Sequence, residues 1–203
     1  MNFLLTIIIS YLIGCVPVSL VVCKLFANKN PGNEGSTNYG ALNSFEITQK
    51  WYIGVIVFLL DFIKGALATV IVYNFIFPKS IYIVIASLFV VTGHCYNVFL
   101  KFYGGKGLST AAGCCLMFNP LILVIWTILW VLFRIVDKDI IFRNIWACLV
   151  TPLIVYLAPQ KMFFMANYNY YVTLYDYKLF SILLCVIILS AHLRGIFYLF
   201  KKN

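Results

Sequence analysis

Long apolar runs alternate with short polar segments along the chain, and this pattern predicts most of its secondary structure. The runs are continuous stretches of aliphatic and aromatic residues rather than the alternating pattern of transmembrane strands. A helix needs about 20 such residues to cross the hydrocarbon core of a membrane. We therefore expect an all-α, polytopic membrane protein with about seven transmembrane helices, one of them short or broken, in a single domain over 1–203. The predicted helices cover 3–26, 52–77, 81–101, 107–118, 120–134, 140–158 and 178–198, and the Tyr- and Asn-rich segment 159–177 is expected to be an interfacial loop.

One boundary decides the number of spans. The run from Leu108 to Phe133 is either one long span or two shorter helices broken at Asn119-Pro120, because proline starts a helix well but does not continue one cheaply. With the break and an outside N-terminus, eleven lysines and arginines fall in inside loops and three in outside loops, whereas six spans divide the same residues equally. Cytoplasmic loops carry an excess of Lys and Arg. We therefore expect the broken helix, an outside N-terminus and a cytoplasmic C-terminus.

Composition supports a lipid environment. Of the 203 residues, 64% are hydrophobic and 10% are charged, whereas a soluble domain carries about 25% charged residues. The net charge of +9 is explained by basic residues on one membrane face, and no basic–aromatic cluster outside the apolar runs argues for nucleic acid, so we expect no nucleic-acid partner. The seven cysteines form no CxxC pair and only two histidines occur, so we expect no metal site and no cofactor.

The polar segment 28–45 offers small residues and amide or hydroxyl side chains at nearly every position. Ser36, Asn38 and Asn43 can donate several hydrogen bonds to one anionic or polyol ligand. Glycines such as Gly40 let backbone N–H groups approach the same ligand. The alternative is an ordinary polar loop, because Gly, Asn and Ser dominate turns.

Three glycines surround a lysine immediately before a predicted helix. Backbone N–H groups at a helix N-terminus attract phosphate, and Lys106 adds a full positive charge. Gly104, Gly105 and Gly107 supply the flexible backbone around it. The GxxxxGK[ST] pattern of a Walker A loop is absent. The alternative is a glycine turn with a snorkelling lysine.

Few titratable residues lie within or beside the apolar runs. Asp61 and Lys64 share one helix face at i,i+3 spacing and are expected to form a structural ion pair. His94 is expected to be a hydrogen-bonded structural residue or to contact substrate, and His192, at the inside end of the last run, is a candidate general base. With Lys106 and Arg134, these residues suit a phosphorylated substrate on the predicted cytoplasmic side.

Five segments follow the order and spacing of the motifs of one known family. They are Gly14-Cys-Val-Pro17, Gly35-Ser-Thr-Asn-Tyr-Gly-Ala-Leu-Asn43, Asp61-Phe-Ile-Lys-Gly65, Gly93-His94 and Phe99-Leu-Lys-Phe-Tyr-Gly-Gly-Lys-Gly-Leu-Ser-Thr110. The chain resembles the bacterial acyl-phosphate:glycerol-3-phosphate acyltransferases of the PlsY type over nearly its whole length, and the last segment is the most specific. The resemblance implies a seven-helix membrane enzyme of phospholipid synthesis. Such an enzyme moves an acyl group from acyl phosphate to the 1-hydroxyl of glycerol 3-phosphate, giving lysophosphatidic acid and phosphate.

The resemblance implies roles for the polar residues. Lys106, His192 and Ser36 would be catalytic, with Lys106 stabilising charge on the phosphate and on the developing oxyanion. His192 would either anchor or deprotonate the acceptor. Substrate binding would fall to Asn38, Gly40, Asn43, Gly104, Gly105, Gly107, Arg134 and His94. The resemblance further implies a multi-pass protein of the bacterial inner membrane. We expect a monomer whose partners are acyl phosphate, glycerol 3-phosphate and membrane lipid.

Several positions depart from the family motifs. The departures are Thr37 for a glycine, Leu42 for a threonine, Glu46 for an arginine, Asp137 for a serine, and Leu193, Gly195 and Tyr198 for an arginine, an asparagine and a second arginine. They remove phosphate-binding cations and add carboxylates. One alternative is therefore a catalytically inactive or substrate-altered paralogue that binds lipid or a partner. A weaker alternative is a small-solute transporter that uses the broken helix and the Asp61/Lys64 pair.

Overall fold

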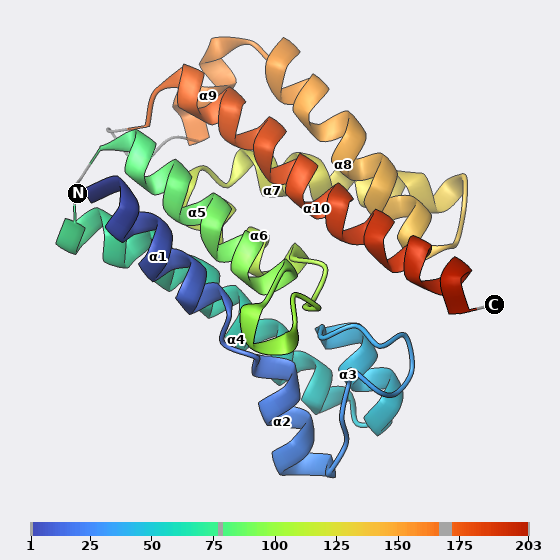
Figure 1. Cartoon of the computed structure of the whole chain (residues 1–203). Coiled ribbons are helices and arrows are strands. Elements are labelled where there is room, and N and C mark those ends of the chain that lie inside the picture. The colour runs from blue at the N-terminus through green and yellow to red at the C-terminus, as the bar shows by residue number, and fades with distance from the viewer. Residues whose placement is uncertain (1, 77–78, 167–171, 203) are drawn as a thin grey trace.

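The chain folds into helices joined by short connections (Figure 1). The computed structural model describes residues 2–76, 79–166 and 172–202, with side chains for 2–75, 79–166 and 172–194. The α-helices are α1 (Asn2–Gly14), α2 (Val18–Ala27), α3 (Ala41–Thr48), α4 (Trp51–Ile71), α5 (Ser80–Cys95), α6 (Leu108–Phe118), α7 (Leu121–Leu132), α8 (Ile140–Leu157), α9 (Gln160–Ala166) and α10 (Leu174–Lys202). A π-helical turn η1 (Val72–Ile76) extends α4, and 3₁₀ turns η2 (Val98–Leu100) and η3 (Phe133–Ile135) follow α5 and α7. Within the described ranges all regular structure is helical, which confirms the all-α prediction.

Among the described residues, five segments are long and apolar enough to cross a membrane. They are Asn2–Ala27, Trp51–Phe75, Ser80–Leu100, Ile140–Leu157 and Leu174–Arg194. Two shorter apolar helices, Leu108–Phe118 and Leu121–Ile135, lie between the third and fourth of these segments in the chain. The prediction of a polytopic helical membrane protein is confirmed, while the orientation of its termini stays a prediction.

The predicted break at Asn119-Pro120 is present. Helix α6 ends at Phe118 and α7 begins at Leu121. The buried Asn119 side chain accepts a hydrogen bond from the Leu121 backbone N–H at 3.0 Å, so it satisfies one of the donors left free at the start of α7. The break therefore has a local cause in sequence, and it leaves α6 as a short helix packed inside the protein.

The predicted continuous helix over 3–26 is wrong in its middle, because the chain bends between α1 and α2. Pro17 has no backbone N–H and disfavours helical geometry in the residue before it. The bend frees two carbonyl groups, and side chains from other helices satisfy them. Lys64 Nζ donates to the Val16 carbonyl at 3.1 Å, and Asn97 Nδ2 donates to the Cys15 carbonyl at 2.7 Å. The bend thus brings polar side chains of α4 and of the end of α5 to one place.

Two short helices occur where the sequence predicted none. Helix α3 lies at the end of the polar segment 28–45, and α9 occupies the first part of the predicted loop 159–177. Helix α10 begins at Leu174 rather than 178 and continues to Lys202. The remaining part of that loop, 167–171, lies outside the described residues.

Two pairs of helices approach closely through glycines. Gly14 of α1 and Gly93 of α5 each face a backbone carbonyl of the other helix, and a Cβ on either would overlap that carbonyl. Gly65 of α4 and Gly113 of α6 do the same for their pair. Small residues let helix backbones pack at short distance in membranes, where lipid is as apolar as the side chains. These contacts hold α4 against the short helix α6 and fix the segment that precedes α6.

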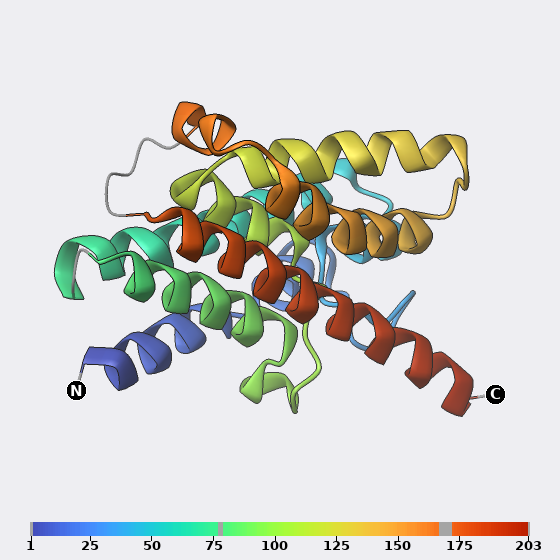
Figure 2. The same cartoon turned by 90° about the horizontal axis from the view of Figure 1, so that it is seen from above.

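Helix α10 lies between α5 and α8, and α8 packs on its other side against α7 (Figures 1 and 2). The apolar core of this half includes Phe118 and Phe180, whose ring centroids are 4.5 Å apart. A second, smaller cluster joins α2 to α4 through Val22, Ile53 and Val57. The polar segments lie outside these two clusters, at the end of the helices where α2, α3 and the loop before α6 are found.

Candidate functional site

Three polar segments that are far apart in sequence meet at this end of the molecule. Gly105 packs against the backbone carbonyl of Tyr39, which joins the segment before α6 to the loop before α3. Arg194 of α10 donates to the Phe102 carbonyl at 2.6 Å, and its guanidinium lies 4.7 Å from the centre of the Tyr96 ring. The sequence predicted that these segments could share a site, and the structure places them in contact.

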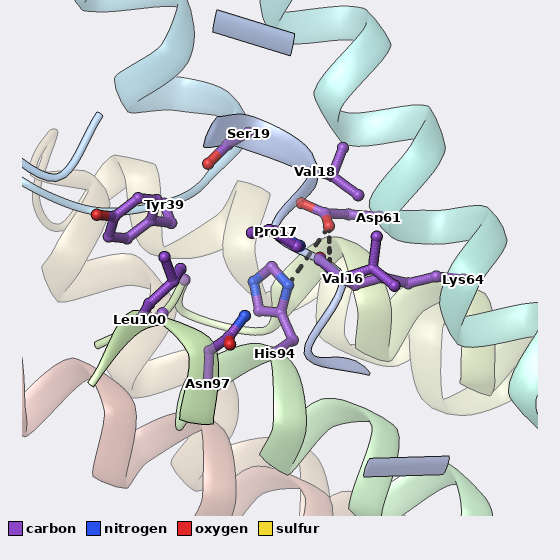
Figure 3. A pocket seen from close by; sticks show the side chains of 12 residues that line it. Val16, Pro17, Val18, Ser19, Tyr39, Asp61, Lys64, His94, Asn97 and Leu100 are labelled. Carbon is purple, nitrogen blue, oxygen red and sulfur yellow. Dashed lines mark hydrogen bonds and ion pairs between the residues drawn. The ribbon is translucent and has the colours of Figure 1, made fainter. Parts of the chain in front are cut away.

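A small cavity lies between these segments and the bend at Pro17 (Figure 3). Its wall includes Tyr39 from the first loop, Asn97 after α5, and Gly104 and Gly105 before α6. The side of the cavity formed by α4 and α5 carries charged and titratable groups, whereas Val16, Pro17, Val18 and Leu100 make the rest of its wall largely apolar.

The charged wall consists of Asp61, Lys64 and His94, all buried. The Asp61 carboxylate lies 2.7 Å from Lys64 Nζ and 3.4 Å from His94 Nδ1, although neither donor is aligned for a hydrogen bond to the shared oxygen. Lys64 also donates to the Val16 carbonyl, as described above. Each charge therefore has a partner within the protein, which is what burial in an apolar interior requires. We assign this group a structural role at the base of the cavity.

The loop before α3 is organised around Asn43, which is buried. Its amide nitrogen lies within 3.0 to 3.2 Å of the carbonyls of Pro31 and Glu34 and 2.9 Å from that of Asn38, and its amide oxygen accepts from the Ser36 backbone N–H at 2.9 Å. Its polar atoms are thus committed to the loop, and Asn43 positions other residues rather than meeting a ligand itself. Ser36 is exposed and Asn38 half-buried.

Gly40 is the residue immediately before α3, with extended backbone geometry. It accepts a hydrogen bond from the Ser44 hydroxyl at 2.9 Å through its carbonyl, and its own N–H donates to the Asn38 carbonyl at 3.0 Å. These contacts set the start of α3 and therefore the position of Glu46 on its exposed side.

The glycine segment before α6 divides into two parts. The N–H groups of Gly104 and Gly105 donate to the carbonyls of Cys95 and His94 at 3.1 Å each, so these two amides serve the fold. Gly107 has a φ of 84°, a conformation that glycine adopts without strain, and it precedes the first residue of α6. Among the described side chains none caps the N-terminus of α6. The helix N-terminus and Lys106 are therefore the parts of this segment suited to an anion.

Lys106 is half-buried between the loop and α6. Burial lowers the pKa of its ammonium group, while the carboxylates of Asp139 and Glu46 act in the opposite direction. Lys106 thus sits in a field of two carboxylates, one on α3 and one immediately before α8. Glu46 is the residue that stands where the family motif carries an arginine.

His192 is buried on α10 and belongs to a chain of hydrogen bonds across three helices. Its Nδ1 lies 2.9 Å from the Ile188 carbonyl, and its Nε2 lies 3.2 Å from the side-chain nitrogen of Asn144 on α8. The Asn144 oxygen accepts from the Trp130 indole N–H of α7 at 2.8 Å. A carbonyl can only accept and an amide NH₂ can only donate, so this chain assigns the proton to Nδ1 and leaves Nε2 as an acceptor.

The sequence indicates Arg134 as a candidate site residue, but the sequence-based predictions did not include Arg143, Asn144 or Trp130. Arg134 is exposed in η3, and among the described side chains it makes no hydrogen bond or ion pair. Arg143 and Asn144 are buried in the first half of α8, within a predicted apolar span. Polar side chains inside such a span usually face the protein interior and mark function, so their presence at 143–144 was the signal that could have found them.

Two further departures lie at the end of α10. Gly195 and Tyr198 belong to its helical backbone, but they lie beyond the last side chain that the structure describes. The position of Arg194 is described, and its contacts with Phe102 and Tyr96 show that it ties the glycine-rich segment to α10.

These features define a polytopic helical membrane protein with a polar, cation-bearing site at one end of its helices. The family model for glycerol-3-phosphate acyltransferase matches residues 4–202, and the chain belongs to this family. The glycerol-3-phosphate acyltransferase of Streptococcus sanguinis is 30% identical over 95% of this chain and 86% of its own length. That of Latilactobacillus sakei is 37% identical over 125 residues, which are 62% of this chain and 60% of the relative.

A solved structure confirms the fold. The crystal structure of the integral membrane glycerol 3-phosphate acyltransferase PlsY (YgiH), in its glycerol 3-phosphate form, is 28% identical with a TM-score of 0.75, and the match covers 100% of this chain and 94% of that one. The lysophosphatidic acid form of the same protein gives a TM-score of 0.74 at 26% identity, over 100% of this chain and 93% of that one. The resemblance found in the sequence motifs is thus confirmed.

Proposed function

We propose that this protein transfers an acyl group from an acyl phosphate to glycerol 3-phosphate, forming lysophosphatidic acid and inorganic phosphate. Membership of the acyltransferase family and the likeness to PlsY structures with glycerol 3-phosphate and with lysophosphatidic acid support the acceptor and the product. The observation that carries the proposal is the position of Lys106, half-buried beside the N-terminus of α6, which no described side chain caps.

In the proposed reaction the acceptor hydroxyl oxygen attacks the acyl carbonyl carbon. The bond between that carbon and the phosphate oxygen breaks, and phosphate leaves. Lys106 and the N-terminus of α6 stabilise negative charge on the phosphate and on the carbonyl oxygen as it develops. Both ring nitrogens of His192 already have partners, Ile188 and Asn144. We therefore assign the hydroxyl proton to the leaving phosphate, and we assign His192 to positioning α10 against α8 through Asn144.

The loop before α3 closes the other side of the site. Asn43 holds the exposed Ser36 and the half-buried Asn38 in the loop that supplies Tyr39 to the cavity wall, and we assign their polar groups to contacts with glycerol or phosphate oxygens. The acyl chain would lie between the apolar helices. We further propose a single domain that acts as a monomer in the bacterial inner membrane, with an outside N-terminus and this site on the cytoplasmic side, where both phosphorylated substrates would be available.

The test is an assay of the purified protein in detergent with palmitoyl phosphate and labelled glycerol 3-phosphate, following lysophosphatidic acid and released phosphate. We expect product from the wild type, none from Lys106→Ala, and wild-type rates from Lys161→Ala, which removes an exposed lysine on α9. Thermal unfolding of each variant shows that it is folded. Full activity in Lys106→Ala would overturn the assignment.

One observation favours a second candidate, a catalytically inactive paralogue that binds lipid or a partner. Two carboxylates, Glu46 and Asp139, act on Lys106, and carboxylates oppose a phosphate ligand. Restoring the family residues in Glu46→Arg and Gly195→Asn separates the two candidates. Activity that appears only in the restored protein indicates a decayed enzyme, whereas activity in the wild type shows that the substitutions are tolerated.

A further inference from the structure

Arg143, in the first turn of α8, is a buried cation with an unused hydrogen-bonding group. Its side chain is only 6% exposed. Nε donates to the Asp139 carbonyl at 3.3 Å and Nη2 donates to the Lys138 carbonyl at 3.2 Å. Nη1 is fully buried and has no partner among the described residues. Native proteins pair almost all buried donors, and an unpaired charged donor is the most costly kind, so Nη1 requires a partner that the protein does not supply.

The guanidinium group of Arg143 is placed close to the hydrogen-bond chain of His192. Its central carbon lies 4.1 Å from the centre of the Trp130 ring. The same indole donates to Asn144, and the Asn144 amide meets His192 Nε2. The Trp130 ring and the Asn144 amide therefore link Arg143 to His192.

The neighbourhood also includes Lys106. The backbone carbonyl of Asp139 accepts a hydrogen bond from Nε of Arg143, and the carboxylate of the same residue interacts electrostatically with Lys106. Lys106 also interacts electrostatically with His192. Two cations, Arg143 by direct contact and Lys106 by its electrostatic interaction, thus act on one region around Asp139 at the start of α8. An anion with several acceptor oxygens fits such a region, because an arginine forms its strongest hydrogen bonds with carboxylate and phosphate.

We propose that Nη1 of Arg143 binds a phosphate group of one of the two substrates, an inference that rests on the proposed function. The stack on Trp130 and the two carbonyl contacts hold the guanidinium plane and leave its third nitrogen for the ligand. Arg143 then supplies a cation to a site from which the departure at Glu46 has removed one.

A purely structural role for Arg143 predicts a different result. Arg143→Gln would then lower the thermal stability of the protein and leave the KM for each substrate unchanged. If Arg143 binds phosphate, Arg143→Gln weakens the affinity for one phosphorylated substrate. Arg143→Lys keeps the positive charge but not the planar set of donors, so it retains part of that affinity. Lys161→Gln is the matched control, because it removes one exposed positive charge from α9.

The kinetic experiment varies glycerol 3-phosphate at saturating palmitoyl phosphate, and then the reverse. Loss of one charge-assisted hydrogen bond is expected to raise one KM by about 10- to 100-fold in Arg143→Gln, with little change in kcat. A rise for glycerol 3-phosphate assigns Arg143 to the acceptor, and a rise for palmitoyl phosphate assigns it to the donor. Unchanged KM values for both substrates overturn the inference.

A binding measurement separates this inference from the proposed function. Glycerol 3-phosphate and inorganic phosphate are added to each purified variant, and the thermal midpoint is followed, since a ligand that binds the folded state raises it. We expect a rise in the wild type and in Lys161→Gln, a smaller one in Arg143→Lys and none in Arg143→Gln. If the wild type forms no lysophosphatidic acid but shows this pattern, the proposed function fails and the anion site stands. An equal rise in all variants, or none in the wild type, overturns the anion site.

Discussion

Thr37 occupies a backbone conformation that its side chain disfavours, and Thr37→Gly should stabilise the protein. Its φ is 56°, in the left-handed region where a β-branched residue is strained. The conformation persists because the Asn43 amide binds the carbonyls of Glu34 and Asn38 on either side of it. Relief of the strain is worth about 1–2 kcal/mol, and the added freedom of glycine in the unfolded chain offsets about 0.4–1 kcal/mol. The net gain is therefore between about 0 and 1.6 kcal/mol.

This gain corresponds to a rise of up to roughly 6 °C in the thermal midpoint, at about 2–4 °C per kcal/mol for a chain of this size. The assay is thermal unfolding in detergent, with the rate of limited proteolysis in the loop 28–40 as a local measure. Asn33→Gly is the matched control: Asn33 is exposed in the same loop and has no positive φ, so glycine there should lower stability by about 0.4–1 kcal/mol. If both glycine variants lower the midpoint and speed cleavage equally, the strain argument is refuted.

Three further variants test the site and the packing. Glu46→Gln should move the alkaline fall of kcat/KM to lower pH, because the reaction needs protonated Lys106 and the Glu46 carboxylate raises the pKa of that ammonium group. The measurement is the pH dependence of kcat/KM, with Glu34→Gln as control. An alkaline fall at the same pH in Glu46→Gln and in the wild type would contradict the interaction between Glu46 and Lys106. Gly65→Ala should destabilise the protein by about 1–3 kcal/mol, because its Cβ would overlap the Thr110 carbonyl of α6. Gly54→Ala on the same helix is the control, because a Cβ there has more room. Equal melting temperatures for the two variants would count against close packing of α4 on α6. Asp61→Asn and Lys64→Met should each lower the free energy of unfolding by about 3–5 kcal/mol, because each single change leaves a buried charge without its ion-pair partner. The double variant should lose much less. Additive losses in the double-mutant cycle would show that the two residues are not coupled.

The spans could be predicted because each depends on local sequence. A continuous apolar run gives a helix wherever it lies, and Asn119-Pro120 breaks one by removing a donor and supplying a cap. The bend at Pro17 has the same local cause, but the apolar run continues through it and the prediction followed the run. Helix α3 depends on the contacts that Asn43 makes with the preceding loop, and such contacts do not appear as a periodic pattern.

The site could be predicted only in part, for a related reason. Lys106 and His192 lie in polar segments or at the end of a span, where a charged or titratable side chain is conspicuous. Trp130 and Asn144 look like parts of apolar spans until α7, α8 and α10 are packed together, because the function of each comes from a partner on another helix. Arg134, a cation in a polar stretch of sequence, lies exposed in the fold, and its role in substrate binding stays a prediction.

The effect of the carboxylates at Glu46 and Asp137 depends on where the fold places them. By sequence, Glu46 and Asp137 indicate a loss of phosphate-binding capacity, because a carboxylate replaces an arginine at one position and a serine at the other. In the structure, Asp137 is exposed and its carboxylate accepts from the Asp139 backbone N–H at 2.8 Å, which shapes the turn into α8. That turn presents the Lys138 and Asp139 carbonyls to Arg143 and so fixes the buried guanidinium. A substitution that removes a hydroxyl from the motif thus helps to hold a cation nearby, and under the proposed role of Arg143 this cation replaces the positive charge that is absent at Glu46.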